Sequence, residues 1–214
     1  MYSRYIKRIL DFVVSLCAII VLLPLIGILT LLGAVQMKGS PFFIQERPGW
    51  HEKRFKLIKF RTMTNEKDSN GELMPDEIRL NKYGRFLRST SLDELPELFN
   101  ILIGQLSIIG PRPLLVNYLP YYTEREHHRH DVRPGLTGYA QVHGRNYVTW
   151  EDKFNMDLWY VNHISLFTDL KILLDTIRVV LKRENIETAS QIVHDGVTYQ
   201  PLDVERRTAD REKV

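Results

Sequence analysis

Two adjacent carboxylates, Asp93 and Glu94, stand in the stretch RSTSLDELPELFN, just ahead of Pro96. Proline is tolerated in the first turn of a helix, where its missing N–H costs no hydrogen bond, so a helix should begin near Leu92 or Asp93. The acids would then lie at the positive end of the helix dipole. One explanation is structural, because Ser91 and Glu94 have the spacing of a capping box. The other is chemical, because ionised carboxylates can act as nucleophiles or as ligands for Mg2+.

Cationic side chains favour the chemical explanation, since they occur in short motifs rich in glycine and proline. Arg112 in GPRPL stands between two prolines that restrict its backbone, and rigidly held arginines suit the recognition of phosphate oxygens. Cations near the two acids would lower the pKa of both and keep them ionised. The cations of this kind are Lys59, Arg61, Arg88, Arg112, Arg133 and Arg145. Together with the acids they indicate phosphoryl chemistry.

Two further patterns are candidate metal sites. EREHHRHD contains His127, His128 and His130, but no cysteine or second ligand cluster accompanies them, which favours a polar surface segment over a zinc site. Asp157, two residues before Trp159, is either a ligand for a divalent cation or a helical acid facing solvent. The glycines of GLTGYAQVHGRN match neither a Walker A motif nor a dinucleotide fingerprint, and we interpret them as a loop that shapes a pocket.

The elements that must position these side chains are predicted from apolar periodicity. Leu95, Leu98, Phe99 and Leu102 recur at helical spacing, which predicts one buried face on the helix that follows the acids. The stretch PFFIQERPGWHEKRFKLIKFRTM reads as two short strands around the turn at 48–49, and therefore as a hairpin.

The C-terminal part is predicted as helix followed by a tail. The last regular element begins near Trp150 and carries an apolar stripe formed by Leu170, Leu173, Leu174, Ile177, Val180 and Leu181. The chain becomes polar after Arg183, so residues 186–214 are expected to form a flexible tail. The tyrosines Tyr118, Tyr121 and Tyr122 indicate either a segment at a membrane interface or a buried loop.

The N-terminal segment contains no charged residue from Phe12 to Val35. At about 1.5 Å per residue, a helix of this length could cross a hydrocarbon core of about 30 Å. Pro24, followed by Gly27, instead predicts a break, and basic residues flank the segment on both sides. Because such residues tend to stay on the cytoplasmic side, we expect a re-entrant helix-break-helix. A single span is the alternative, since proline also occurs in spanning helices.

Composition agrees with one folded domain: of 214 residues, 44% are hydrophobic and 26% charged. The net charge is only +3 and the arginines do not line one helix, which argues against nucleic acid as a partner. Basic residues around the apolar segment suit an anionic membrane surface, so membrane phospholipids are expected partners. The single cysteine, Cys17, excludes an intrachain disulfide.

Four motifs now stand in order after the apolar segment: KFRTM, RSTSLDELPELFNIL, IIGPRPLL and RPGLTGYAQVHGRN. They closely resemble the bacterial sugar transferase family, the monotopic polyprenyl-phosphate phosphoglycosyl transferases, over nearly the whole chain up to about Arg183. The stretches GELMPDE and HRHDVRPG resemble most closely the PglC-type enzymes of protein glycosylation, which use UDP-N,N'-diacetylbacillosamine.

The resemblance implies a two-step transfer of a sugar 1-phosphate from a UDP-sugar to undecaprenyl phosphate, with release of UMP. It implies that Asp93 is the nucleophile, which forms an aspartyl phosphosugar, and that Glu94 is a ligand for Mg2+ beside it. The positions that match cationic residues of the family motifs, and that would contact phosphate or uridine, are Lys59, Arg88, Arg112 and Arg145.

We therefore expect an α+β, mainly helical protein at the cytoplasmic membrane. Its expected parts are a re-entrant membrane helix (1–36), a cytoplasmic catalytic domain with a small β-hairpin and interfacial amphipathic helices (37–185), and the polar tail (186–214). Two alternatives stay open. One is the same reaction with UDP-galactose, UDP-glucose or UDP-N-acetylgalactosamine; the other is a non-enzymatic membrane scaffold, which would release no UMP.

Overall fold

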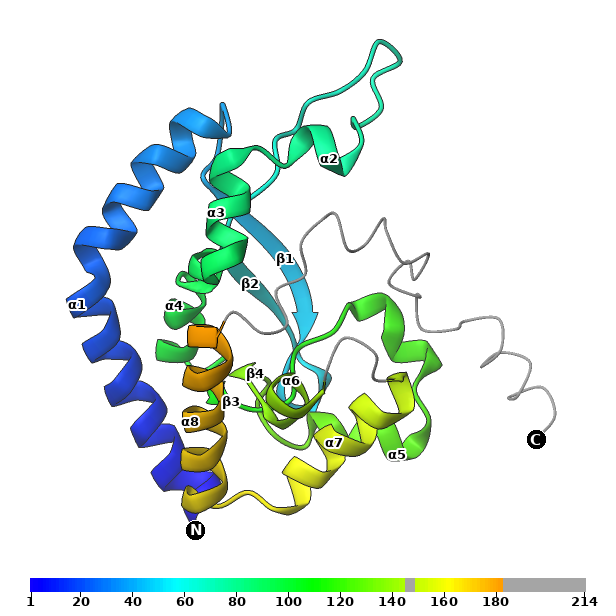
Figure 1. The fold of residues 1–214 in the computed structure, drawn as a ribbon. Coiled ribbons are helices and arrows are strands. Elements are labelled where there is room, and N and C mark those ends of the chain that lie inside the picture. Colours follow the sequence, from blue (N-terminus) through cyan, green and yellow to red (C-terminus); the bar gives the residue numbers. More distant parts are fainter. Residues whose placement is uncertain (145–148, 183–214) are drawn as a thin grey trace, which may run out of the picture.

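The structure, a computed structural model, describes residues 1–144 and 149–182 of the chain. It is mostly helical, with two small two-stranded sheets. Figure 1 shows the long helix α1 bowed along one side of a body formed by the hairpin and the shorter helices. The expected mainly helical architecture with a small hairpin is therefore confirmed.

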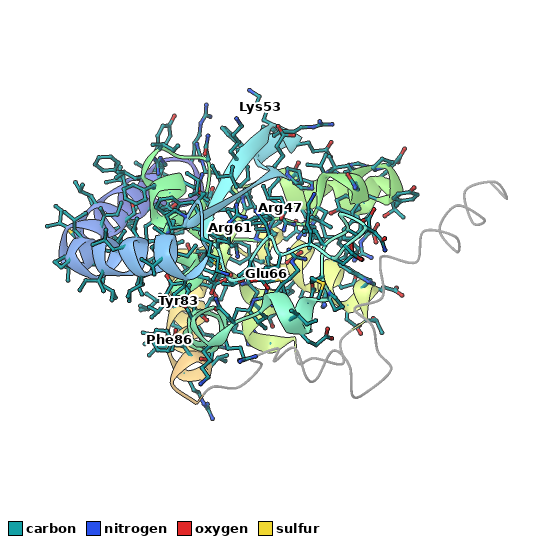
Figure 2. The ribbon with its side chains drawn as sticks, turned by 90° about the horizontal axis from the view of Figure 1, so that it is seen from above. Arg47, Lys53, Arg61, Glu66, Tyr83 and Phe86 are labelled. Atoms are coloured by element: carbon teal, nitrogen blue, oxygen red, sulfur yellow. The ribbon has the colours of Figure 1, made fainter. Side chains whose placement is uncertain are left out.

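The hairpin predicted around residues 48–49 is present. Its elements are β1 (Phe42–Pro48), the turn η2 (Trp50–Glu52) and β2 (Arg54–Phe60), and the two strands pair antiparallel. Phe60 is buried, whereas Lys59, its neighbour on the other face of β2, is only partly covered. Figure 2 shows Lys53 projecting outward beyond the hairpin turn. Lys59 lies on the same face of β2 as the buried Phe55 and Leu57, so the hairpin presents its ammonium group at the end of a face that otherwise packs into the core.

The second sheet joins two glycine-rich motifs that lie far apart in the sequence. Its parallel strands are β3 (Ser107–Ile109) and β4 (Gly135–Thr137). The backbones approach so closely that a Cβ atom on Gly135 would lie 2.1 Å from the nitrogen of Gly110, so only glycine is accommodated at position 135. Arg112 follows this contact by two residues.

The helix predicted to follow the two acids is divided into a 3-10 turn and a short α-helix. The elements here are α2 (Asp76–Arg79), α3 (Lys82–Thr90), η3 (Leu92–Glu94) and α4 (Glu97–Leu102). Pro96 stands at the N-cap of α4, as its position predicts. Leu98 is buried, but Phe99 is 38% exposed and Ile101 is fully buried in its place. The prediction for Phe99 is wrong because η3 is a 3-10 helix with about three residues per turn. The residues that face the core therefore no longer follow the α-helical spacing counted from Leu95.

The apolar N-terminal segment forms one continuous helix. After the π-helical turn η1 (Tyr2–Ile6), α1 (Lys7–Gln36) runs through Pro24 without interruption. The expected break is absent. Pro24 removes only one backbone hydrogen bond, and the helix stays continuous because residues on both sides of the proline pack on the domain. By length and composition, the segment Tyr2–Gln36 is the one described helix that could cross a membrane.

Helix α1 packs against the rest of the domain along its length. Its buried positions are Asp11, Ser15, Ile19, Ile26, Leu29 and Gly33. At its N-terminal end three charged side chains bind the domain: Lys7 to Asp169 (2.7 Å), Arg8 to the carbonyls of Ile101 and Leu102 (2.7 Å each), and Asp11 to the Ser107 hydroxyl (2.8 Å). Near its C-terminal end, the hydroxyl of Tyr83 donates to the Leu29 carbonyl (2.7 Å; Figure 2). The helix is thus part of the domain's own packing.

Apart from β3 and β4, the regular elements of the described C-terminal half are helices. They are η4 (Val116–Tyr121), α5 (Glu124–His127), η5 (His128–His130), α6 (Tyr139–His143), α7 (Trp150–Asn162) and α8 (Leu166–Lys182). The predicted stripe on α8 faces outward, with Leu170 and Leu174 52% and 59% exposed, while Asp169 and Ile172 are buried. Tyr122 is also buried, which favours the buried loop for the tyrosine segment. The expected tail lies outside the described residues.

Two apolar clusters connect α1, β2 and the segment around the acids. The first contains Ile19, Phe55, Leu57, Leu98, Ile101 and Leu106. The second contains Ile26, Leu29, Phe60 and Leu87. Since both clusters include β2, the strand that carries Lys59 is fixed relative to the turn that carries Asp93 and Glu94.

Candidate active site

Asp93 and Glu94 lie in the turn η3, where the chain changes direction between α3 and α4. Ser91 precedes the turn with a left-handed backbone (φ 54°), and its side chain caps no helix. The Glu94 carboxylate is directed to cations instead, since its Oε1 accepts hydrogen bonds from Lys59 Nζ (2.8 Å) and Arg112 Nη2 (3.0 Å). The capping-box explanation is therefore wrong, and the structure brings two of the sequence-predicted cations to the acids.

The two cations determine the charge of Glu94. Burial alone would raise the pKa of this carboxyl, but the charges of Arg112 and Lys59 and their hydrogen bonds outweigh it and lower the pKa to about 2. The Glu94 side chain is 20% exposed, so water screens these attractions only weakly. Glu94 is therefore ionised throughout the physiological pH range.

Asp93 responds to the same surroundings in the opposite direction. Burial and then the negative charge of Glu94 raise its pKa to about 6, and Lys59 and Arg112 offset this only in part. The expectation of a lowered pKa is wrong for Asp93, because the sequence indicates nearby cations but not burial. At neutral pH the group is still mostly ionised, and as a weakly stabilised anion it is a stronger base than an ordinary carboxylate.

A third acid, Glu97, belongs to the same cluster and is absent from the sequence-based candidates. It is 3% exposed, and its Oε1 lies 2.9 Å from Lys59 Nζ, so Lys59 bridges Glu94 and Glu97. Burial, opposed by Lys59 and reinforced by Glu94, raises the pKa of Glu97 to about 7. Its spacing of four residues from Asp93 is a signal that could have placed it near the acids.

Arg112 owes its position to the two glycine-rich motifs. The Gly110 amide donates to the carbonyl of Thr137 (2.9 Å), which holds the start of the GPRPL motif against β4. The carbonyl of Arg112 itself accepts a hydrogen bond from Arg129 Nη2 (2.8 Å). These backbone contacts fix the residue whose side chain, 47% exposed, reaches Glu94 with its guanidinium.

The other predicted cations lie elsewhere. From α3, Arg88 donates to the hydroxyl of Thr62 (3.1 Å), and among the described residues no hydrogen bond or ion pair joins it to either acid. Arg61 and Arg133 donate to backbone carbonyls. Arg145 lies outside the described residues.

The two candidate metal patterns have structural partners. Asp157 is buried, not solvent-facing, and its Oδ2 accepts hydrogen bonds from Arg129 Nε (3.1 Å) and Nη2 (2.6 Å). His130 is also buried, so the histidine stretch is not wholly a surface segment, and burial lowers the pKa of His130 to about 4. Across residues 1–144 and 149–182 no group of three or more histidines, cysteines and acids could hold a metal ion.

A cavity of about 250 Å³ adjoins the acidic cluster. Its lining combines charged side chains with apolar and aromatic ones, among them Arg47, Lys59, Glu97, Arg112, Tyr118 and Trp150. The rings of Tyr118 and Trp150 pack edge to face with centroids 5.7 Å apart. Arg47, which is labelled in Figure 2, comes from β1 and was not a sequence-based candidate. Such a lining suits an anion that carries an aromatic ring.

Asp93 and Glu94 also fit a divalent cation. Both hydrogen bonds to Glu94 use Oε1, so within the described part of the chain its Oε2 accepts no hydrogen bond. Proteins hold Mg2+ through one or two carboxylates together with phosphates of a substrate, so these two residues suffice. A Mg2+ ion bound there would neutralise charge on transferring phosphates.

Comparison with known proteins gives a family and several relatives. The model of the family described as "Bacterial sugar transferase" matches residues 2–183. The chain is 54% identical over 173 residues to "Uncharacterized sugar transferase EpsL" of Bacillus subtilis (strain 168). The aligned region covers 80% of this chain and 86% of that protein.

Two longer relatives have names that state a reaction. The chain is 36% identical over 200 residues to the undecaprenyl-phosphate galactose phosphotransferase of Salmonella typhimurium, covering 85% of this chain and 42% of the relative. It is 38% identical over 181 residues to the UDP-glucose:undecaprenyl-phosphate glucose-1-phosphate transferase of Klebsiella pneumoniae, covering 80% of this chain and 39% of the relative. The chain thus spans less than half of either relative. With the family model matching nearly all described residues, the chain is an enzyme that belongs to the bacterial sugar transferase family.

Proposed function

We propose that the chain transfers a sugar 1-phosphate from a UDP-sugar to undecaprenyl phosphate and releases UMP, through a covalent intermediate on Asp93. The observation that carries the proposal is the convergence of Asp93, Glu94, Lys59 and Arg112 beside one cavity. A basic carboxylate next to fixed cations is the arrangement required for nucleophilic attack on an anionic phosphate. The names of the Salmonella and Klebsiella relatives support the donor and acceptor classes.

In the first step, a carboxylate oxygen of Asp93 attacks the phosphorus that carries the sugar. A bond forms between this oxygen and phosphorus, the bond from phosphorus to the bridging oxygen breaks, and UMP leaves with the bonding electrons. Lys59 and Arg112, which already contact Glu94, lie where they can neutralise charge on the diphosphate. Asp93 and Glu94 would hold Mg2+, which supplies further charge neutralisation.

In the second step, a phosphate oxygen of undecaprenyl phosphate attacks the same phosphorus. The bond to Asp93 breaks, the carboxylate is regenerated, and the product is a polyprenyl diphosphate sugar. Because both displacements use one residue, the water-soluble donor and the lipid acceptor do not need to be bound together.

In this proposal both ends of helix α1 stay at the cytoplasmic face of the membrane, with the domain on the cytoplasmic side. Because α1 is unbroken at Pro24, it would lie bowed within one leaflet instead of turning back at a break (Figure 1). Support comes from the contacts of Lys7, Arg8 and Asp11, which hold the N-terminal end against the domain. A membrane-impermeant maleimide should therefore label Ser3→Cys, in a Cys17→Ser background, in inside-out vesicles but not in intact spheroplasts. Labelling in intact spheroplasts would instead support a single span.

The sugar is the finer part of the proposal. The motif resemblance favours UDP-N,N'-diacetylbacillosamine, whereas relatives are named for galactose, glucose and N-acetylgalactosamine. Turnover of these four UDP-sugars, measured side by side, assigns the donor by the largest kcat/KM.

The reaction is tested by UMP release from purified protein with Mg2+ and undecaprenyl phosphate, together with intact mass after incubation with donor alone. Wild type should release UMP and gain the mass of one phosphosugar. Asp93→Asn should do neither, and Glu94→Gln should be severely slowed and less dependent on Mg2+. The exposed acid Asp76, changed to Asn, is a matched control that should behave as wild type. Absence of release with every donor would favour the membrane scaffold.

A further inference from the structure

A buried ion pair between Arg129 and Asp157 contacts the backbone of Arg112. The side chains of Arg129, from η5, and Asp157, from α7, are only 2% and 7% exposed. Neither residue lines the cavity beside the acids. A buried ion pair is weak evidence for a contribution to stability, because removing two charges from water offsets most of their attraction. A role in orientation is therefore the better explanation to examine.

The geometry of the Arg129 guanidinium indicates what it orients. Its Nε and Nη2 atoms donate to Asp157 Oδ2 (3.1 and 2.6 Å), and Nη2 also donates to the carbonyl of Arg112 (2.8 Å). The guanidinium carbon lies 5.6 Å from the centroid of the Phe154 ring, and Nη1 lies 3.5 Å from the Tyr122 hydroxyl. The fork of donors is rigid and planar, so fixing one edge on a carboxylate fixes the direction of the remaining N–H groups.

We infer that Arg129 and Asp157 are positioning residues for Arg112. The pair holds the Arg112 backbone at its carbonyl, so that the Arg112 side chain meets Glu94 and the phosphates of the donor. Asp157 therefore serves the reaction through an arginine and not as a metal ligand. The contact between Arg112 and the donor phosphates rests on the proposed function. The positioning of the Arg112 backbone by Arg129 does not depend on it.

Two substitutions separate this role from a contribution to folding alone. Asp157→Asn removes the charge that fixes Arg129. Arg129→Lys retains an ion pair with Asp157, but one ammonium on a flexible chain does not reproduce the planar fork. Asp169→Asn is the matched control, because Asp169 is equally buried (5% for both acids) and paired with Lys7, yet has no contact with Arg112 among the described residues.

Kinetic coupling provides the first readout. At temperatures below the unfolding transition of each variant, we expect Asp157→Asn and Arg129→Lys to lower kcat/KM for the UDP-sugar on the order of 10- to 100-fold. Small misplacements of a binding group have effects of this size. Asp169→Asn should lower the thermal midpoint but leave kcat/KM unchanged. In an Arg112→Ala background, Asp157→Asn should cause no further loss of kcat/KM. Full additivity with Arg112→Ala would overturn the inference.

Hydrogen exchange provides a readout that does not depend on catalysis. Asp157→Asn should speed amide exchange in peptides covering residues 112–118 without a matching change in α1. Asp169→Asn, whose side chain reaches Ile109 through the Tyr160 hydroxyl but does not reach Arg112, should leave residues 112–118 protected. If wild type releases no UMP but this exchange pattern holds, the proposed function fails and the positioning role stands. Unchanged exchange in residues 112–118 would overturn the positioning role even if the enzyme is active.

Discussion

At the scale of single residues, neighbouring carboxylates in one turn have opposite properties. Glu94 has a pKa of about 2 because both cations contact it directly, while Asp93 has a pKa of about 6 because burial and Glu94 disfavour its charge. Pairs of acids whose pKa values are separated in this way commonly have different roles. Here the permanently ionised Glu94 fixes the cations, and Asp93 is the residue equipped to attack.

The raised pKa of Asp93 predicts a pH dependence. Formation of the covalent intermediate at low Mg2+ should rise with pH and reach half its maximum near pH 6, because only the deprotonated carboxylate attacks. Rapid-quench measurement of UMP release between pH 4.5 and 8.5 tests this. Glu97→Gln is the control, since it removes the other group that titrates in this range. The variant should still show the rise of intermediate formation near pH 6. A flat profile would contradict the assignment.

Glu97 predicts an effect on stability with a defined sign. Its pKa is raised from 4.5 to about 7 in the folded protein, so the folded state binds the proton more tightly and loses stability as pH rises through this interval. Glu97→Gln resembles the protonated acid and can still accept a hydrogen bond from Lys59. We expect the thermal midpoint of the variant to equal that of wild type at pH 4.5 and to exceed it at pH 8.5. Equal midpoints at both pH values would show that Glu97 has an ordinary pKa.

At the scale of elements, the sequence predicts what is local. The hairpin, the place of Pro96 and the stripe on α8 depend on neighbours in the chain. The continuity of α1, the phase of α4 and the burial of Asp157 depend on partners far along the chain, which periodicity and spacing do not show. The candidate site divides in the same way: motif composition indicates Asp93, Glu94 and the cations, spacing along the chain could add Glu97, and only the fold adds Arg129.

The contact between β3 and β4 predicts a sensitive glycine. In Gly135→Ala the new Cβ would lie 2.1 Å from the nitrogen of Gly110, so the two motifs must separate and Arg112 would be displaced. We expect a loss of about 1–3 kcal/mol in the free energy of unfolding, measured by chemical denaturation, with a greater than proportional loss of UMP release. Gly27→Ala is the matched control, because its Cβ would contact nothing within 4 Å and should stabilise α1 by up to about 1 kcal/mol.

At the scale of the whole molecule, apolar side chains remain exposed on two helices. On α1 they include Val13, Ile20, Val21, Leu31 and Val35, and on α8 they include Leu170, Leu174 and Ile177. A soluble protein rarely leaves so many large apolar residues in water, so these faces suit contact with lipid.

The exposed stripe of α8 predicts a membrane contact that can be weakened without unfolding the protein. Leu170→Ser combined with Leu174→Ser should reduce binding to zwitterionic vesicles roughly 30-fold, since each half-exposed leucine contributes about 1 kcal/mol when buried in lipid. The thermal midpoint in detergent should not change. Lys171→Ser, an exposed substitution on the same helix, should bind vesicles as wild type does. Equal binding by all three proteins in a sedimentation assay would exclude α8 from the membrane contact.

The long sequence separation between α1 and its polar partners has a consequence for biosynthesis. Asp11 and Ser107 are 96 residues apart, and Lys7 and Asp169 are 162 residues apart. A ribosome therefore releases an apolar helix with charges near its end long before their partners exist. Closure of the domain at Lys7 must therefore wait until Asp169 has been synthesised, so in nascent chains truncated before Asp169 the N-terminal end of α1 should be held less firmly on the domain than in the finished enzyme.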